Sequence, residues 1–344
     1  MSATVGVLAN PRSGTDVRRL AARATSMPHG SRRDEVARAV VGAVAAGAER
    51  VVLVDDAFRI AAQAVAALDL PASLELVRLP YRHGPEDSIV GAVRLRDEGC
   101  GALIALGGDG TSRAVAKGWR DVPLVPLSTG TNNVFPLRIE ATVAGAAAGL
   151  IATGQVSAAE AAPPAKVVRV QIDGEPDDLA LIDAVFLEDD RVGNYLPFEA
   201  ARIRCVVLSR AEPASIGMSP IGGLLVPCRP DEDFGVVVRC VGHEGEGRRL
   251  RVPLSAGLYG TVHVADAQRV ELGEEAAVVG PGVLAFDGDR ERALAAGQRA
   301  TLRVVRDGPR VIDVDLTLRL AAERGLFHDL PAWADAAGGG VDCC

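Results

Sequence analysis

One short segment combines glycines, an aspartate and a threonine in a spacing that could handle a phosphate group. Gly107-Gly-Asp-Gly-Thr111 follows the apolar run Leu103–Leu106, which predicts a buried strand ending abruptly. Glycines let backbone N–H groups approach an oxyanion, and the N-terminus of a following helix favours negative charge. Asp109 would repel a phosphate unless a metal ion or an accepted proton offsets its charge. The segment therefore suggests catalysis; the alternative is an ordinary strand-to-helix turn in which Asp109 caps the helix.

Two more polar loops follow apolar runs in the same half of the chain. Asn10-Pro-Arg-Ser-Gly14 comes after Thr4–Ala9, and Ser128-Thr-Gly-Thr-Asn-Asn133 comes after Pro123–Leu127. In a parallel sheet, ligands bind outside the carboxyl ends of the strands. We therefore expect all three loops to lie on one edge of the sheet and to form one site.

The second half of the chain holds three further aspartates of interest. Asp183 lies in the apolar run Leu179–Leu187, where burial of a carboxylate is costly without a partner, so it either contacts a substrate or is a satisfied structural group. Asp287-Gly-Asp289 could supply catalytic carboxylates, or it could be an Asp-Gly hairpin turn.

Charged residues elsewhere have simpler interpretations. Arg113 and Lys117 are four residues apart and share a helix face, so they could reach phosphates, but we expect them on a solvated surface. Glu188-Asp-Asp190 is expected to be a solvated loop rather than a metal site, and the metal ligands stay unknown.

Positioning these loops requires an α/β domain followed by a different architecture. Strands alternate with helices up to about residue 157, which predicts a parallel sheet with helices on both faces. Ala158–Ala165 resembles a linker, and short strands dominate the rest. We predict a nucleotide-binding α/β domain over residues 1–157, a β-rich domain over 158–330 that completes an interdomain active site, and a disordered tail over 331–344.

Within the β-rich half, the predicted elements begin with a hairpin over Lys166–Leu187 that turns at Asp173-Gly174. One helix is expected at Pro197–Ser209, and a second at Leu318–Gly325. The remaining strand predictions are Phe234–Val241, Arg249–Leu254, Gln268–Leu272, Ala300–Arg306 and Val311–Leu316.

Composition limits the partners. The 344 residues are 48% hydrophobic and carry a formal net charge of -8, so bulk electrostatics argue against nucleic acid or an anionic membrane surface. Aromatic residues make up only 3% of the chain, which disfavours stacking on single-stranded nucleic acid. No run of 18 apolar residues predicts a membrane span, and the six cysteines form no CxxC pair. We expect a cytoplasmic protein whose partners are small molecules.

The order of the NPxSG, GGDGT and GTxN sequences resembles the NAD kinase and diacylglycerol kinase superfamily. Within it, the chain is most similar to the ATP-NAD kinase/AcoX family, that of acetoin catabolism protein X. The resemblance covers residues 4–292, so it spans both predicted domains. The sequences that carry it are Gly107–Lys117, Pro123–Pro136, Asp178–Val185, Arg210–Leu225, Asp233-Phe234 and Ala285–Arg290.

This resemblance implies an ATP-dependent kinase that phosphorylates a hydroxyl of a small soluble acceptor, with Mg²⁺ neutralising phosphate charge. NAD(H) is the named candidate for the acceptor; the alternatives are an acetoin- or diol-related metabolite, or a non-catalytic nucleotide-binding regulator. The resemblance places Asp109, Asp287 and Asp289 in catalysis and Asp183 against the acceptor, and it implies a homo-oligomer. The implied nucleotide-binding residues are Asn10, Ser13, Gly107, Gly108, Gly110, Thr111, Thr129, Gly130, Thr131, Asn132 and Asn133.

The chain departs from NAD kinases at the acceptor side. Pro213–Gly223 lacks the threonines and the tyrosine of the loop that recognises the dinucleotide, and Ile182 stands where an asparagine is expected. The P-loop pattern GxxxxGK[ST] is also absent. Phosphoryl transfer is therefore better founded than NAD as the acceptor.

Overall fold

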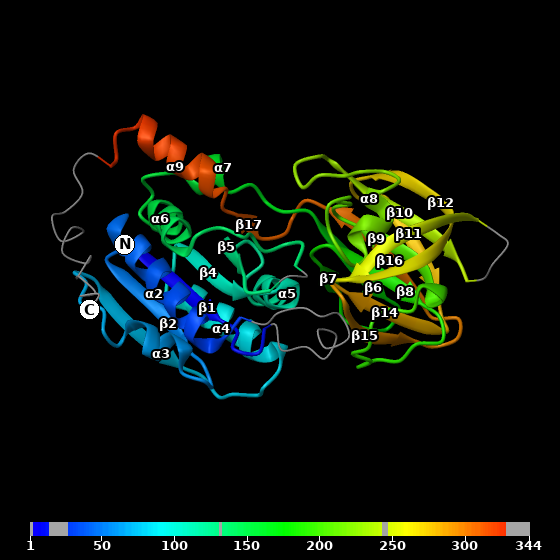
Figure 1. Ribbon diagram of the computed structural model, residues 1–344, viewed down its shortest axis with the longest axis horizontal. Coiled ribbons are helices and arrows are strands. Elements are labelled where there is room, and N and C mark those ends of the chain that lie inside the picture. The colour runs from blue at the N-terminus through cyan, green and yellow to red at the C-terminus, as the bar shows by residue number, and fades with distance from the viewer. Residues whose placement is uncertain (1–2, 14–26, 131–132, 243–246, 328–344) are drawn as a thin grey trace.

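The computed structural model describes residues 3–13, 27–130, 133–242 and 247–327. It contains two domains that lie side by side along the long axis of the molecule (Figure 1). The N-terminal domain has a parallel six-stranded sheet in the order β17-β5-β4-β1-β2-β3. The C-terminal domain consists of a seven-stranded and a four-stranded sheet, both antiparallel. The predicted fold class is confirmed.

The first sheet is buried at its centre. Every residue of β1 and β4 is buried, which explains why both strands are apolar runs without alternation. The strands of this sheet are β1 (Thr4–Ala9), β2 (Arg50–Asp55), β3 (Ser73–Arg78), β4 (Ala102–Gly107), β5 (Pro123–Ser128) and β17 (Arg310–Val311).

Helices cover both faces of the sheet. Helices α2 (His29–Ala45), α3 (Ile60–Val65), α6 (Ala141–Ala152) and α9 (Val314–Glu323) share one apolar core, and α4 (Pro85–Asp97) and α5 (Asp109–Gly118) share the other. Helices α2 and α6 pack closely because a Cβ at Gly42 or Gly145 would overlap the backbone of the facing helix. Helix α5 lies where the two domains meet (Figure 1).

The C-terminal domain packs its two sheets around a common apolar core, and a second core with α8 (Ser219–Gly223) covers the other face of the larger sheet. The larger sheet has the order β11-β12-β10-β9-β8-β14-β15. Its strands are β8 (Asp183–Leu187), β9 (Ile203–Leu208), β10 (Phe234–Val241), β11 (Arg248–Ser255), β12 (Leu258–Glu271), β14 (Gly282–Phe286) and β15 (Asp289–Leu294). The smaller sheet contains β13 (Glu275–Val279), β16 (Arg299–Val305), β6 (Val167–Ile172) and β7 (Asp178–Ala180).

Two predicted elements are wrong. The helix expected at Pro197–Ser209 is a 3₁₀ turn (Ala200–Arg202) followed by strand β9. Strand β9 pairs on both sides, with β8 and β10, so its run of buried residues reflects a central strand. The strand expected at Val311–Leu316 ends at Val311, because Asp313 caps a helix by accepting a hydrogen bond from the Leu316 amide.

The chain enters and leaves the C-terminal domain at one place. The backbone of Ala165 exchanges hydrogen bonds with the returning segment, through Pro309 O and Gly308 N, and β17 then joins the N-terminal sheet beside β5. Thus β17 and α9, which fall within the β-rich domain predicted over 158–330, pack on the N-terminal domain. Part of the expected linker forms helix α7 (Ala158–Ala161). The predicted tail 331–344 lies outside the described residues.

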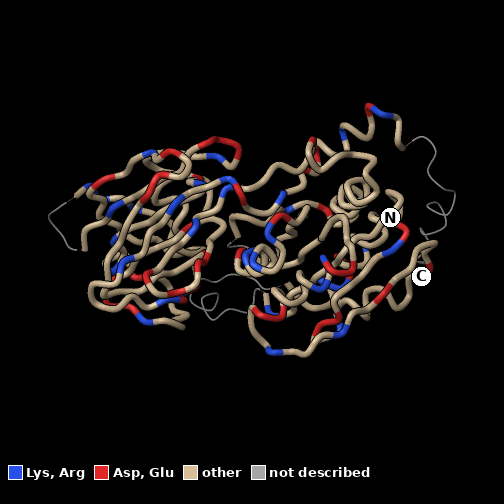
Figure 2. Tube along the Cα trace, turned by 180° about the vertical axis from the view of Figure 1, so that it is seen from behind, with Lys and Arg blue, Asp and Glu red and all other residues tan. Residues whose placement is uncertain are grey.

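Two further observations concern the distribution of charged residues and the length of the apolar helices. Acidic and basic residues are interspersed along both domains, as Figure 2 shows. None of the helices in the described part of the chain is long and apolar enough to cross a membrane.

Candidate active site

The three polar loops meet at the carboxyl edge of the N-terminal sheet, as their positions after strands predict. The Asn10 amide donates to Thr111 Oγ1 at 2.9 Å, and the Thr129 hydroxyl donates to Ser13 Oγ at 2.9 Å. The Asn133 side chain is held within its own loop by a 2.8 Å hydrogen bond to Ser128 Oγ. These contacts connect all three loops. Thr131 and Asn132, also predicted to bind nucleotide, lie outside the described residues.

The turn into α5 depends on its glycines. A Cβ at Gly107 would overlap the Thr111 side chain, and a Cβ at Gly108 would lie 2.9 Å from Asn133 Oδ1. Gly108 is the N-cap of α5, and no side chain among the described residues caps the first amides of the helix. The N-terminus of α5 therefore offers backbone N–H groups and a favourable dipole to an anion.

Asp109 is fixed by the neighbouring loop. Its carboxylate accepts hydrogen bonds from the backbone amides of Phe135, at 2.8 Å, and Val134, at 3.1 Å. Because Gly108 occupies the N-cap, the alternative that Asp109 caps α5 is wrong. Burial raises the pKa of Asp109 to about 7, and the charge of Asp287 adds to this rise, while the two amides and Arg210 oppose it. A carboxylate with such a pKa can exchange a proton near neutral pH.

Asp287 holds the opposite side of the site together. It adopts a left-handed backbone with φ of 48° at the turn between β14 and β15. Its carboxylate accepts hydrogen bonds from the amides of Leu181 (2.8 Å), Ile182 (2.7 Å) and Asp183 (3.3 Å). Burial raises its pKa to about 6, although Arg113 and the three amides lower it. These hydrogen bonds lie where the apolar run Leu179–Leu187 divides into strands β7 and β8.

Asp183 has no comparable support. It is buried, and among the described residues its Oδ1 atom has no hydrogen-bond partner. Burial raises the pKa of Asp183 well above its usual range, and the charges of Asp287 and Asp109 raise it further. It is therefore not the satisfied structural carboxylate that the sequence left open.

The fourth aspartate comes from the C-terminal domain to the start of α5. Asp289 Oδ2 lies 3.4 Å from the position that a Cβ on Gly110 would occupy. The described residues contain no group of three or more histidine, cysteine, aspartate or glutamate side chains placed to hold a metal. Mg²⁺ does not require three such side chains, because in phosphoryl-transfer sites one or two carboxylates and the substrate phosphates hold it. Asp289, beside the anion-binding end of α5, fits that requirement.

The four aspartates line a small cavity of about 280 Å³ between the domains. The polar loops form one side of this small cavity, and apolar residues of the C-terminal domain form the other. The apolar residues are Pro197, Phe198, Ile216, Met218 and Leu254.

A large cavity of about 860 Å³ adjoins the small one and shares five lining residues with it: Asn10, Arg12, Gly110, Thr111 and Asp289. Three exposed aromatic side chains line this large cavity, Phe58 and Tyr81 from the N-terminal domain and Tyr195 from the C-terminal domain. Asp55, at the carboxyl end of β2, also lines it. The site therefore has two connected compartments.

Ion pairs attach α5 to the C-terminal domain. Arg113 Nη2 lies 2.9 Å from Asp178 Oδ1 and also pairs with Glu291, while Lys117 Nζ lies 2.9 Å from Asp178. Burial opposes ionisation of Asp178, but Arg113 and Lys117 outweigh it and lower its pKa to about 2. The prediction that Arg113 lies on a solvated surface is wrong, since its side chain is only 5% exposed. Its partner Asp178 is 65 residues away, so helix periodicity could not reveal it.

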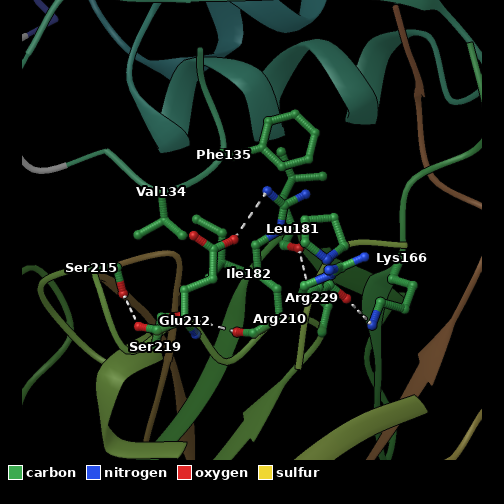
Figure 3. Close-up of polar contacts among 12 residues, drawn as sticks. Val134, Phe135, Lys166, Leu181, Ile182, Arg210, Glu212, Ser215, Ser219 and Arg229 are labelled. Carbon is green, nitrogen blue, oxygen red and sulfur yellow. Dashed lines mark hydrogen bonds and ion pairs between the residues drawn. The ribbon is translucent and has the colours of Figure 1, made fainter. Parts of the chain in front are cut away.

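A second buried arginine, which sequence reasoning missed, supports the loop that holds Asp109. The Arg210 guanidinium points toward Phe135 (Figure 3), 4.9 Å from the centre of its ring, and Glu212 lies 3.8 Å away. Burial lowers the pKa of Arg210. The sequence signal for Arg210 was its position at the start of Arg210–Leu225, one of the segments that carry the family resemblance.

The acidic loop Glu188–Asp190 also differs from the prediction. Asp190 is buried rather than solvated, and its carboxylate pairs with the Arg290 guanidinium at 2.6 Å. Arg290 is buried too and stacks on Phe198, 4.1 Å from the ring centre, so this ion pair supports the apolar wall of the small cavity.

Comparison with known proteins gives one match for each half of the chain. Residues 5–155 match the family model of the ATP-NAD kinase N-terminal domain, and residues 166–307 match that of the acetoin catabolism protein X C-terminal domain. Acetoin catabolism protein X from Cupriavidus necator is 35% identical over 341 residues, which cover 95% of this chain and 94% of that protein.

A solved structure with a TM-score above 0.5 shows the same fold at low identity. The crystal structure of yeast NADH kinase complexed with NADH matches with a TM-score of 0.53 and 11% identity, over 96% of this chain and 89% of that chain. A putative diacylglycerol kinase from Bacillus anthracis matches with a TM-score of 0.47 and 13% identity, over 90% of this chain and 97% of that chain. The likeness to the yeast enzyme concerns the fold.

Proposed function

The chain belongs to the family of acetoin catabolism protein X, and from this premise we propose that it is a kinase that transfers a phosphoryl group from ATP to a hydroxyl of a small soluble acceptor. One observation carries the proposal. Asp109, with a pKa of about 7, lies in a cavity directly beside the uncapped N-terminus of α5. A base and an anion site in contact are what phosphoryl transfer to a hydroxyl requires.

In this proposal the donor lies across both cavities. Its phosphates bind the N-terminus of α5 between Asn10 and Thr111, which line both cavities. Its nucleoside lies in the large cavity, where Tyr81 and Tyr195 are exposed for stacking and Asp55 is placed for a ribose hydroxyl. Mg²⁺ neutralises phosphate charge when bound, with Asp289 as the residue that holds it.

The acceptor hydroxyl then lies in the small cavity. Asp109 takes its proton, the Val134 and Phe135 amides hold Asp109 in place, and Asp287 holds the backbone around Asp183. Asp287 is thus a positioning residue in this proposal, and its predicted direct part in catalysis stays a prediction. NAD(H) is the acceptor that the ATP-NAD kinase family model supports, whereas Ile182 and Pro213–Gly223 argue against it. A cytoplasmic location and a homo-oligomer stay predictions.

The test is transfer of the labelled γ-phosphate of ATP, with Mg²⁺, to a panel of NAD, NADH, nucleosides and diols. We expect a labelled product with at least one acceptor. Asp109→Asn should lower turnover by about 10²–10⁴-fold while ATP still binds. The matched control is Asp97→Asn, whose carboxylate is 55% exposed on α4. Binding of ATP without transfer to any acceptor would favour a non-catalytic regulator.

A further inference from the structure

The charge of the small cavity is one-sided. Among the residues that the structure describes, four aspartates line it, Asp109, Asp183, Asp287 and Asp289, against a single arginine, Arg12. The Arg12 guanidinium donates to the carbonyl of His83, a residue that lines the large cavity. An anionic group on the acceptor would therefore face acidic side chains there and, in the described part of the chain, no basic side chain other than Arg12.

The two buried arginines nearest these carboxylates do not line the small cavity. Arg113 pairs with Asp178 and Glu291, neither of which lines the small cavity. Arg210 lies over the Phe135 ring beside Glu212, as Figure 3 shows. Neither guanidinium is placed to hold a phosphate or carboxylate of an acceptor there.

The opposite wall is apolar. Ile216, Met218 and Leu254 come from two segments of the C-terminal domain, and Phe198 lies beside them in the lining. Arg290 covers one face of the Phe198 ring, which keeps that ring fixed. Such a wall suits short alkyl groups rather than further hydroxyls or charges.

Asp183 is the polar group of the small cavity that needs a partner. Its buried Oδ1 is unpaired within the described part of the chain, and leaving a buried polar atom unpaired is unfavourable. A hydroxyl both donates and accepts hydrogen bonds, so it can pair with this oxygen in either protonation state of Asp183. An acceptor with one hydroxyl at Asp109 and another at Asp183 satisfies both aspartates.

We propose that the small cavity binds the acceptor as an uncharged vicinal diol with a short alkyl flank, one hydroxyl at Asp109, the other at Asp183, and the alkyl group against Ile216 and Met218. The inference rests on the proposed kinase function and names the acceptor class for it. In the transfer, the first hydroxyl oxygen forms a bond to the γ-phosphorus of ATP as the bond to the β–γ bridging oxygen breaks. ADP leaves with the electron pair, and the hydroxyl proton passes to Asp109.

Binding without nucleotide tests the inference apart from the chemistry. Saturation-transfer NMR or calorimetry compares butane-2,3-diol and propane-1,2-diol with propan-1-ol, glycerol 3-phosphate and NAD. We expect the diols to bind at least about fivefold more tightly than propan-1-ol, since the second hydroxyl pairs with Asp183. That preference should disappear in Asp183→Ala and persist in the Asp97→Asn control. Equal binding of diol and mono-alcohol to the unmodified protein would overturn the inference.

A second variant tests the apolar wall without touching the aspartates. Ile216 is half-buried in a loop, so Ile216→Glu should fold, and it should weaken butane-2,3-diol binding about fivefold or more. Labelled-ATP assays on the same compounds then separate the two proposals. Transfer to NAD but not to any diol would overturn the diol inference and leave the kinase proposal standing. Diol binding without transfer of the phosphoryl group to any compound would overturn the kinase proposal and leave the diol inference standing.

Discussion

Asp109, Asp183 and Asp287 share one buried space but accept different numbers of backbone hydrogen bonds. Asp287 accepts from three amides, Asp109 from two, and the described residues leave Asp183 Oδ1 with none. Burial raises the pKa of all three, to about 6 for Asp287, to about 7 for Asp109, and well above the usual range for Asp183. Arg113 and three amides oppose this rise at Asp287, and two amides and Arg210 oppose it at Asp109, since each of them favours the charged carboxylate.

The first prediction concerns the pH dependence of catalysis. If Asp109 takes the acceptor proton, it must be ionised, so kcat/KM should rise about tenfold per pH unit below about 7 and level off above it. Initial rates between pH 5.5 and 8.5 measure this. Residual activity of Asp109→Asn should lack the same limb, and a flat profile from pH 6 to 8 in the unmodified enzyme would contradict the role.

The second prediction concerns stability at Asp183. Its folded-state pKa lies above the unfolded value, so between these two values the folded protein binds more protons and its stability falls as pH rises. Asp183→Asn removes that dependence. We expect the variant to gain roughly 1–3 kcal/mol in free energy of unfolding at pH 8 and little at pH 4, by urea titration. A loss of stability at pH 8 would show that the charged carboxylate has a stabilising partner.

At the residue scale, the sequence predicted what local spacing can encode. The strand, glycine and aspartate order identified Asp109, and the apolar run around Asp183 identified a carboxylate in an unfavourable place. Arg113 and Arg210 depend on contacts with Asp178 and Phe135, which are distant in the chain. Periodicity could not indicate that these two arginines are buried.

At the scale of elements, α5 is the part that both domains hold. Helix α5 follows strand β4 at the sheet edge, and its Arg113 pairs with Asp178 on β7 and Glu291 on β15. The N-terminal end of α5 therefore keeps a fixed position relative to Asp289 and the small cavity. This attachment explains how two domains can build one site.

The third prediction tests this attachment. Arg113→Ala should lower the free energy of unfolding by about 3–5 kcal/mol, because it leaves the Asp178 carboxylate, whose side chain is 1% exposed, without its buried partner. Arg319→Ala is the control, since its pair with Asp315 on α9 is exposed and should contribute less than about 1 kcal/mol. Urea unfolding of both variants measures the difference. Equal effects would mean that Lys117 and Arg292, which also pair with Asp178, replace Arg113.

Element predictions failed where pairing decides the structure. Residues 197–209 include a run of apolar residues that fits a buried helix as well as a central strand, and pairing with β8 and β10 selects the strand. The sequence pattern does not predict strands β13, β14 and β15, although Asp287-Gly288 is typical of the kind of turn that joins β14 and β15. The parallel half was more predictable because each buried strand there ends in a polar or glycine-rich loop.

At the scale of the whole molecule, the proposed function places both substrates in the two connected cavities between the domains. A ligand that binds the folded protein there stabilises it by mass action. The fourth prediction is that MgATP at about 100 times its Kd adds about 2.7 kcal/mol to the free energy of unfolding, seen as a rise in Tm. Gly107→Ala, whose new Cβ would overlap Thr111, should lose the response. No rise in Tm at millimolar MgATP would contradict nucleotide binding.

The hydrogen-bonded segments at Ala165 and Pro309 have one further consequence. Because the chain leaves and returns at adjacent points, residues 166–307 form an insert in a host domain whose sheet closes again with β17. The three polar loops belong to the host, while Asp183, Ile216, Met218 and the rest of the apolar wall belong to the insert. Exchanging that insert between relatives would therefore change the acceptor side of the proposed site, together with Tyr195 and Asp289 on its donor side, and leave the polar loops of the host unchanged.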